Sequence, residues 1–139
     1  MPDVLNRVKI AKSFGSASNS YDVSSRLQRY TGKHLMSFLP NRTDLTVVDL
    51  GSGTGFFTDI LASKYRQTIG IDISTKMLAF AQKNRSKEIN WIEADAYHLP
   101  FQNNSIDVIY SNLVIQWCDH LDILVKEVLR VLKPGGLFI

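Results

Sequence analysis

The feature that most constrains the fold is an alternation of short, strand-like segments with amphipathic helical segments. The strand-like segments are TVVDL, QTIGID, NWIEAD, SIDVIYSN and the final GLFI, and the helical ones are FTDILASKY, STKMLAFAQKN and DHLDILVKEVLRVL. Their order is β-α-β-α-β-x-β-α-β, where x is a connection without helical spacing. This order predicts an α/β fold with a parallel sheet covered by helices on both faces. Ligands of such sheets bind beyond the carboxyl ends of the strands.

A different pattern precedes the alternation. In DVSSRLQRYTGKHLMSFLP the apolar residues recur every three to four positions, which predicts one amphipathic helix with Asp22 as a candidate N-cap and Pro40 as a stop. We therefore predict an N-terminal helical arm or lid over residues 1–43 and a ligand-binding α/β core over residues 44–139.

Positive charge is concentrated in the arm. Residues 1–42 contain seven Lys or Arg and two Asp, a net charge of +5, whereas the other 97 residues contain nine Lys or Arg and eleven acids, a net charge of −2. A basic arm of this kind attracts an acidic partner. The simpler alternative is that Lys and Arg keep an exposed helix in solution.

Composition and residue counts exclude several classes of site. With 139 residues, 45% of them hydrophobic, the chain can build one core, and no apolar run approaches the ~20 residues of a membrane span. One cysteine and three scattered histidines provide neither an intramolecular disulfide nor a Cys/His metal site. The first residues, MPDVLNRVKIAKSFG, do not show the apolar segment and small-residue cleavage site typical of a secretion signal, so we do not expect secretion. We expect a cytoplasmic protein without a metal ion, and neither a membrane nor a nucleic acid as partner.

The strongest chemical signal is the segment VVDLGSGTGFFT, in which a buried strand runs through a glycine-rich turn directly into a helix. Gly51, Gly53 and Gly55 allow positive φ angles and let a ligand approach bare backbone. A dinucleotide site places its third glycine one residue later. Asp49 before the turn repels a pyrophosphate and attracts an ammonium group, which favours a zwitterionic ligand. The alternative is that the glycines only shape the turn.

Two more acidic residues end the next two strands. Asp72 follows Gly51 by 21 residues, a position from which a carboxylate can accept both hydroxyls of a ribose. Its alternative role is N-cap of the helix that begins near Ser74. Asp95 ends the third strand, where it can accept from an exocyclic amine such as adenine N6. Together these positions predict a nucleoside with a charged amino-acid tail.

The motifs VVDLGSGTG, GIDIS, EADAYHLPF, SIDVIYSN and VLRVLKPGGLFI resemble, in order and spacing, those of class I S-adenosylmethionine-dependent methyltransferases. The resemblance covers residues 45–139. It implies a Rossmann-like fold and S-adenosylmethionine as cofactor, with S-adenosylhomocysteine as product. By the same resemblance, the residues around the methionine part are Asp49, Gly51, Gly53 and Gly55, Asp72 binds the ribose, Asp95, Ala96, Ile73 and Met77 surround the adenine, and Asn112 lies beside the cofactor.

A narrower resemblance extends to the arm. Two segments, IAKSFGSASNSYDVSSRLQRYTGKHLMSFLP and SNLVIQWCDHLDILVKEVLRVLKPGG, are similar to those of malonyl-acyl carrier protein O-methyltransferases of biotin synthesis. Members of that family esterify the free carboxylate of a malonyl thioester. This likeness implies that Tyr21 and Gln28 close over the cofactor. Arg29, Gln116 and Trp117 become candidates for the substrate side, and no catalytic residue is assigned with certainty. Tyr21 and Trp117 have the alternative of being ordinary core aromatics.

The resemblance implies an acyl carrier protein or malonyl thioester as partner. Members of that family continue past the fifth strand, so we expect C-terminal strands to be missing, slow or absent methyl transfer by these residues alone, and dimers through an exposed sheet edge. The alternatives are another small-molecule class I methyltransferase, a nicotinamide-dependent oxidoreductase, and a non-catalytic cofactor-binding module.

Overall fold

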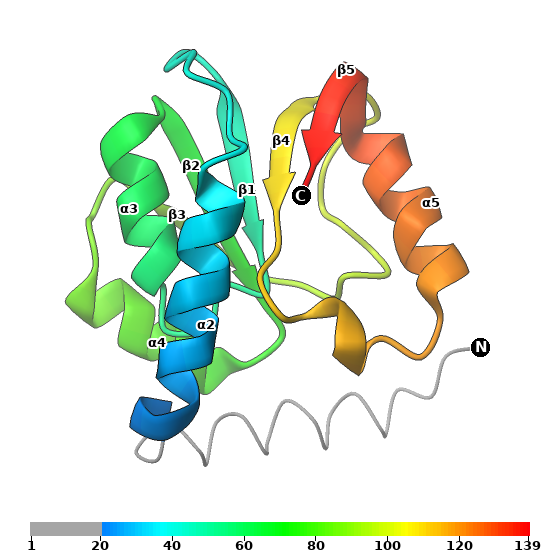
Figure 1. The fold of residues 1–139 in the computed structure, drawn as a ribbon. Coiled ribbons are helices and arrows are strands. Elements are labelled where there is room, and N and C mark those ends of the chain that lie inside the picture. The colour runs from blue at the N-terminus through cyan, green and yellow to red at the C-terminus, as the bar shows by residue number, and fades with distance from the viewer. Residues whose placement is uncertain (1–20) are drawn as a thin grey trace.

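In a computed structural model that describes residues 21–139, with side chains from residue 25 onward, the chain forms a five-stranded parallel sheet with helices on both faces (Figure 1). The strands are β1 (Thr46–Leu50), β2 (Gln67–Asp72), β3 (Asn90–Glu93), β4 (Ile106–Tyr110) and β5 (Leu132–Phe138). The helices are α2 (Tyr21–Met36), α3 (Phe56–Lys64), α4 (Thr75–Asn84), the 3₁₀ turn η2 (Ile115–Trp117) and α5 (Leu121–Val131). The Rossmann-like α/β class and the alternating order predicted from the sequence are confirmed.

The strands lie in the order β3-β2-β1-β4-β5. The chain therefore winds outward from β1 in one direction through β2 and β3, and then crosses back to continue in the other direction through β4 and β5. Right-handed crossovers in opposite directions place their helices on opposite faces of a sheet. The point where the direction reverses lies between β1 and β4, which is where open α/β sheets form ligand crevices.

Alternating residues of the central strands fill two separate cores, as strand geometry requires. On one face, Val47 and Tyr110 pack with Phe57 and Leu61 of α3. On the other, Val48 and neighbouring strand residues pack with α5. The inward side chains of α5 are Leu124, Val128 and Val131. None of the helices within residues 21–139 is long and apolar enough to cross a membrane.

The arm helix α2 lies alongside α3 (Figure 1). Gly32 permits this approach, because a Cβ atom there would lie 2.2 Å from Cζ of Phe57. The helix ends at Met36, before the predicted stop at Pro40, because the chain closes a turn in which Leu39 N–H donates to the Met36 carbonyl. Residues 1–20 of the predicted arm and the side chain of Asp22 lie outside the described residues, and the division at residue 43 stays a prediction.

The connection between β3 and β4 is not helical, as the sequence indicates, and it is fixed by α5. Glu127 accepts a hydrogen bond from the Leu99 N–H at 2.6 Å, and the Arg130 guanidinium donates to the carbonyls of Leu99 and Phe101 at 2.9 and 2.8 Å. Arg130 also pairs with Glu127, which holds the pKa of that carboxyl below its usual value. This network shapes the segment that follows β3 and contributes to the site.

Strand β5 begins earlier than predicted. Leu132 already pairs with Ile106, and the next pair is Val108 with Leu137, so residues 133–136 form a bulge in which Gly135 has a φ of +77°. The LKPGG segment therefore belongs to an irregular strand, and α5 ends before it, at Val131. Within residues 21–139, β5 is the end strand of the sheet, and the predicted dimer through this edge stays a prediction.

Candidate functional site

A cavity opens at the carboxyl ends of β1 to β4, at the edge where the sheet reverses its winding direction. It encloses about 880 Å³, including the solvent at its mouth, which is in the range of small-molecule sites. Nine of the twelve residues predicted to bind the cofactor line it: Gln28, Gly51, Gly53, Asp72, Ile73, Met77, Asp95, Ala96 and Asn112. Within the described residues, no group of three or more His, Cys, Asp or Glu side chains could hold a metal ion.

The glycine-rich turn forms the floor of the cavity and is tied to β2. The N–H groups of Gly51 and Ser52 both donate to the Ile71 carbonyl at 2.8 Å, and the Gly53 N–H donates to Oδ2 of Asp72 at 2.8 Å. Gly51 has a φ of +74°, and a Cβ atom on it would lie 2.2 Å from Cγ2 of Val114. Both the backbone conformation and the space at Gly51 therefore require glycine.

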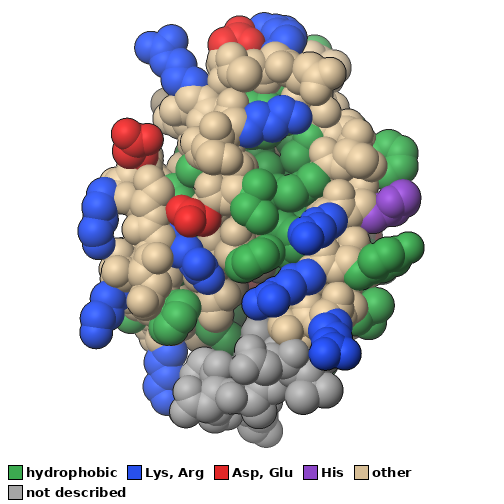
Figure 2. All heavy atoms as spheres, turned by 60° about the vertical axis from the view of Figure 1, so that its left-hand side comes forward, with side chains coloured by type: hydrophobic (Ala, Val, Ile, Leu, Met, Phe, Trp, Pro, Cys, Tyr) green, Lys and Arg blue, Asp and Glu red, His purple; other side chains and the backbone are tan. Residues whose placement is uncertain are grey.

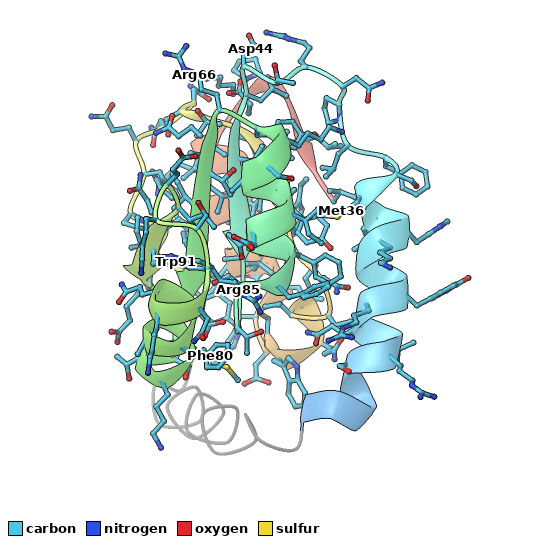
Figure 3. The ribbon with its side chains drawn as sticks, turned by 90° about the vertical axis from the view of Figure 1, so that its left-hand side faces the viewer. Met36, Asp44, Arg66, Phe80, Arg85 and Trp91 are labelled. Atoms are coloured by element: carbon cyan, nitrogen blue, oxygen red, sulfur yellow. The ribbon has the colours of Figure 1, made fainter. Side chains whose placement is uncertain are left out.

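The third glycine of the turn serves packing instead of lining the cavity. Gly55 caps the N-terminus of α3 with a φ of +76°, and a Cβ atom on it would meet the Trp91 ring at 2.4 Å. Nearby, Nε of Arg85 donates to the Thr54 carbonyl at 3.0 Å. Trp91 and Arg85 reach the turn from β3 and from the end of α4 (Figure 3). Trp91 and Arg85 contact the side of the turn that faces away from the cavity, and Gly51 and Gly53 lie on the side that lines it.

Asp72 braces two backbone segments at the cavity wall. Its Oδ1 accepts from the Ser74 N–H and its Oδ2 from the Gly53 N–H, both at 2.8 Å. The N-cap of α4 is Ser74, whose Oγ accepts from the Met77 N–H at 3.4 Å, so the alternative of Asp72 as N-cap is wrong. Burial raises the pKa of Asp72, although the backbone hydrogen bonds partly oppose the shift. Each carboxylate oxygen can still accept a second hydrogen bond from a ligand hydroxyl.

Asp49 lies beneath the turn and outside the cavity lining. Its side chain is 3% exposed, and the hydroxyl of Thr58 donates to its Oδ2 at 2.6 Å. Burial raises the pKa of Asp49 to about 7, the Thr58 hydrogen bond opposes this shift, and the charge of Asp72 adds to it. Burial raises the pKa of the Tyr110 phenol, and the charge of Asp49 adds to this shift. A cation near the turn would favour ionised Asp49.

The remaining walls come from the segments after β3 and β4. Oδ1 of Asp95 accepts from the Tyr97 N–H at 3.0 Å, which presents Asp95 and Ala96 to the cavity. After β4, the Ser111 hydroxyl donates to the Leu50 carbonyl at 3.0 Å, joining the ends of β4 and β1. Asn112 next to it contacts α2 through hydrogen bonds to Gln28 and Thr31.

Of the three candidates for the substrate side, one lines the cavity and two lie outside its lining. Trp117 lines the cavity with 46% of its surface exposed, so its alternative as a core aromatic is wrong. Gln116 is exposed and is not among the lining residues. Arg29 also stays outside the lining, and its guanidinium lies over the Phe56 ring, 4.9 Å from the centroid. The side chain of Tyr21, which was predicted to close over the cofactor, is outside the described part of the chain. The functional roles of all four residues stay predictions.

Sequence reasoning missed several lining residues. Leu113 and Val114 form the wall after β4, and Tyr97 contributes after β3. Leu113 has a φ of +57°, unusual for a bulky residue, and nothing in its neighbours indicates this. Only their position could have identified these residues, because a residue just after a strand of a parallel sheet lies near the edge where ligands bind.

Comparisons with known proteins agree with this geometry. A family model described as a methyltransferase domain matches residues 48–139. The chain is 44% identical over 133 residues to a biotin biosynthesis bifunctional protein BioHC of Cellvibrio japonicus, covering 95% of this chain and 26% of that protein. It is 36% identical over 132 residues to a malonyl-[acyl-carrier protein] O-methyltransferase of Pectobacterium atrosepticum, covering 95% of this chain and 52% of the relative.

Solved structures show the same fold. A Haloferax volcanii methyltransferase in complex with the Trm112 activator superposes with a TM-score of 0.81 and 27% identity, over 90% of this chain and 57% of that one. An S-adenosylmethionine-dependent methyltransferase from Mesorhizobium loti gives a TM-score of 0.71 and 32% identity, over 76% and 50%. The chain spans about half the length or less of the curated relatives it matches.

Proposed function

Because this chain belongs to the class I S-adenosylmethionine-dependent methyltransferases, we propose that its cavity binds S-adenosylmethionine and that the protein methylates the free carboxylate of a malonyl thioester on an acyl carrier protein. The observation that carries the cofactor proposal is the arrangement at one sheet edge of a bare glycine turn, Asp72 and Asp95. The acceptor proposal is supported by the names of the relatives. Its alternative within the family is another small-molecule acceptor.

The residues present fit this cofactor. Gly51 and Gly53 offer backbone without side chains on the cavity side, where a methionine chain can lie against the turn. Asp72 would accept from ribose hydroxyls, while Asp95 would accept from the adenine amine. Met77 and Ile73 would pack against the adenine ring. Asp49, buried beneath the turn, would stabilise the ammonium group directly or through water.

The methyl transfer requires few acid or base groups from the protein. The cofactor supplies a methyl group on a sulfonium, and a malonyl carboxylate is ionised at pH 7 because its pKa lies near 4. Such a nucleophile needs no general base. The protein's part is to position the acceptor and to exclude water, and correct positioning supplies on the order of 7–11 kcal/mol in comparable reactions. Trp117, at the cavity wall and half exposed, is our candidate for contact with the acceptor.

The face formed by α2 supports an acidic macromolecular partner. Arg26, Arg29 and Lys33 are exposed on this helix, and Leu27 and Tyr30 between them are 63% and 75% exposed. Figure 2 shows Lys and Arg side chains spread around an apolar area, with few Asp or Glu. Such a surface attracts a negatively charged protein at long range and offers it apolar contact at short range.

Neutralising Arg26, Arg29 and Lys33 to Gln is expected to lower the association rate with acyl carrier protein about tenfold at low salt, because exposed charges steer encounter. At about 0.5 M salt the difference should nearly vanish, since screening shortens the range of the charges. Stopped-flow binding at several salt concentrations measures this. The matched control neutralises Lys76, Lys83 and Lys126, which are also exposed but lie on α4 and α5. An equal loss in both triple variants would contradict a local docking surface.

The raised pKa of Asp49 leads to a pH prediction. An ammonium group near the turn favours the ionised carboxylate, so binding below pH 7 requires Asp49 to lose a proton. Affinity for S-adenosylhomocysteine should therefore fall about tenfold between pH 8 and pH 6, with proton release at pH 6. Calorimetry in buffers of different ionisation enthalpy measures both. Asp49→Asn should remove the proton release, and a release that persists in this variant would assign it to another group, such as Asp72.

Methyl transfer is tested with labelled S-adenosylmethionine and malonyl-acyl carrier protein, for the 139-residue chain and for any longer natural form of it. With a longer form we expect label in a base-labile ester on the malonyl group, and none on the carrier protein bearing the monomethyl ester. With the 139-residue chain alone we expect this transfer to be slow or absent. Transfer to an unrelated small acceptor would favour the alternative substrate. Tight binding without transfer in every form would favour a cofactor-binding module, and binding of NADH instead would indicate an oxidoreductase.

A further inference from the structure

We propose that Thr31 and Asn112 are positioning residues that hold Gln28 of α2 at the cofactor cavity, so that binding of the cofactor and docking of α2 are coupled. This inference rests on the proposed cofactor. It changes the role of Asn112, which the family resemblance placed beside the cofactor. It also assigns a role to Thr31, for which the sequence resemblance implied none.

The side-chain amide of Asn112 is directed to α2 on both of its ends. Its Nδ2 donates to the Gln28 carbonyl at 2.8 Å, and its Oδ1 accepts from the Thr31 hydroxyl at 2.9 Å. A flipped amide would set Oδ1 against the Gln28 carbonyl oxygen, so the arrangement selects one orientation. Asn112 is 5% exposed, and loss of either partner would leave a buried polar group without its hydrogen bond.

The hydroxyl of Thr31 also lies 3.0 and 3.1 Å from the carbonyls of Leu27 and Gln28. These two acceptors belong to its own helix, whereas Asn112 Oδ1 lies 81 residues away along the chain. A threonine whose hydroxyl bonds only to carbonyls of its own helix does not need to lie against the side chain of Asn112. The hydroxyl therefore links α2 to the segment that follows β4.

Two further contacts fix the same turn of α2. The Tyr110 hydroxyl donates to the Gly32 carbonyl at 3.0 Å, and Gly32 itself lies against the Phe57 ring of α3. The Arg29 guanidinium lies over Phe56, the first residue of α3. The turn that carries Gln28 is thus attached to the end of β4, which precedes one cavity-lining segment, and to the start of α3, which follows another. A shift of either segment on ligand binding would move Gln28.

The test compares Thr31→Val, which removes the hydroxyl at nearly constant shape, with Thr31→Ser, which keeps it. We expect Thr31→Val to weaken S-adenosylhomocysteine binding five- to tenfold, mainly through faster dissociation, and Thr31→Ser to bind within twofold of the wild type. The control is Thr75→Val, an exposed helical threonine outside the cavity lining. Combining Thr31→Val with Gln28→Ala should weaken binding no more than Gln28→Ala alone, because Thr31 acts through Gln28.

Hydrogen exchange of the α2 amides separates positioning from general stability. In the wild type, S-adenosylhomocysteine should slow exchange over residues 27–33, and this protection should be lost in Thr31→Val. The inference is overturned if wild type and Thr31→Val bind equally, or if Thr31→Ser is as weak as Thr31→Val. A wild-type chain that does not bind S-adenosylhomocysteine overturns the cofactor proposal itself, so the two failures are distinguishable.

Discussion

Gly51→Ala is expected to lower the free energy of unfolding by about 2–4 kcal/mol and to weaken S-adenosylhomocysteine binding at least about 100-fold. A left-handed backbone costs a residue with a Cβ about 1–2 kcal/mol. At Gly51 the new methyl would also meet Val114, 2.2 Å from its Cγ2, and Val114 lines the cavity. Relief of this clash moves either the turn or the cavity wall. Chemical denaturation and calorimetry measure the two effects.

Gly135→Ala is the matched control for this variant. Gly135 has nearly the same φ, +77°, but lies in the bulge of β5, and a Cβ atom on it would have nothing within 4 Å. We expect this variant to lose only the conformational part, about 1 kcal/mol, and to bind the cofactor normally. Similar losses of stability in the two variants would show that the contact with Val114 is not what constrains Gly51.

Asp72→Ala is expected to weaken S-adenosylhomocysteine binding by roughly 1–3 kcal/mol, which is about 5- to 150-fold. A carboxylate that accepts from ribose hydroxyls forms charge-assisted hydrogen bonds, and these disappear in the variant. Part of the loss has a second source, because Asp72 also accepts from the N–H groups of Gly53 and Ser74. Calorimetry on the wild type and the variant gives the total effect.

A ligand pair separates the two sources. The wild type should prefer S-adenosylhomocysteine to its 2′,3′-dideoxy analogue, whereas Asp72→Ala should bind the two with similar affinity. Damage to the turn alone would weaken both ligands equally and leave the preference intact. A preference that persists in the variant would therefore contradict the ribose assignment while keeping the structural role of Asp72.

Most of the fold could be predicted from the sequence, because strand and helix periods are local properties of the chain. The order of elements and the non-helical connection before β4 both follow from such patterns. The start of β5 could not be predicted, because residues 133–136 have no strand-like character and belong to the strand only through the pairs on either side of them, Leu132 with Ile106 and Leu137 with Val108. That information is non-local.

The residues of the site also fall into those that local sequence patterns predict and those that depend on non-local contacts. Asp72 at the end of β2 and Asp95, two residues after β3, could be assigned to the cavity edge because strand ends of a parallel sheet meet there. The contacts of Asn112 with α2 could not, since they join residues 81 and 84 positions apart and depend on how a helix lies on the sheet. Gln116 and Trp117 are adjacent in sequence, yet only Trp117 reaches the cavity lining. Both residues belong to the 3₁₀ turn η2, which was not predicted.

The reversal of the sheet between β1 and β4 also determines when a binding site can exist during folding. The neighbours β1 and β2 pair residues 21 positions apart, whereas β1 and β4 pair residues 61 positions apart. Closing the longer loop costs about 1 kcal/mol more in chain entropy. The unit β1-α3-β2-α4-β3 can therefore assemble while β4 is still being synthesised or is unpaired. The cavity has walls from both sides of this junction, so cofactor binding reports that β1 and β4 have paired. The ligand therefore stabilises molecules in which this most distant strand pairing has formed.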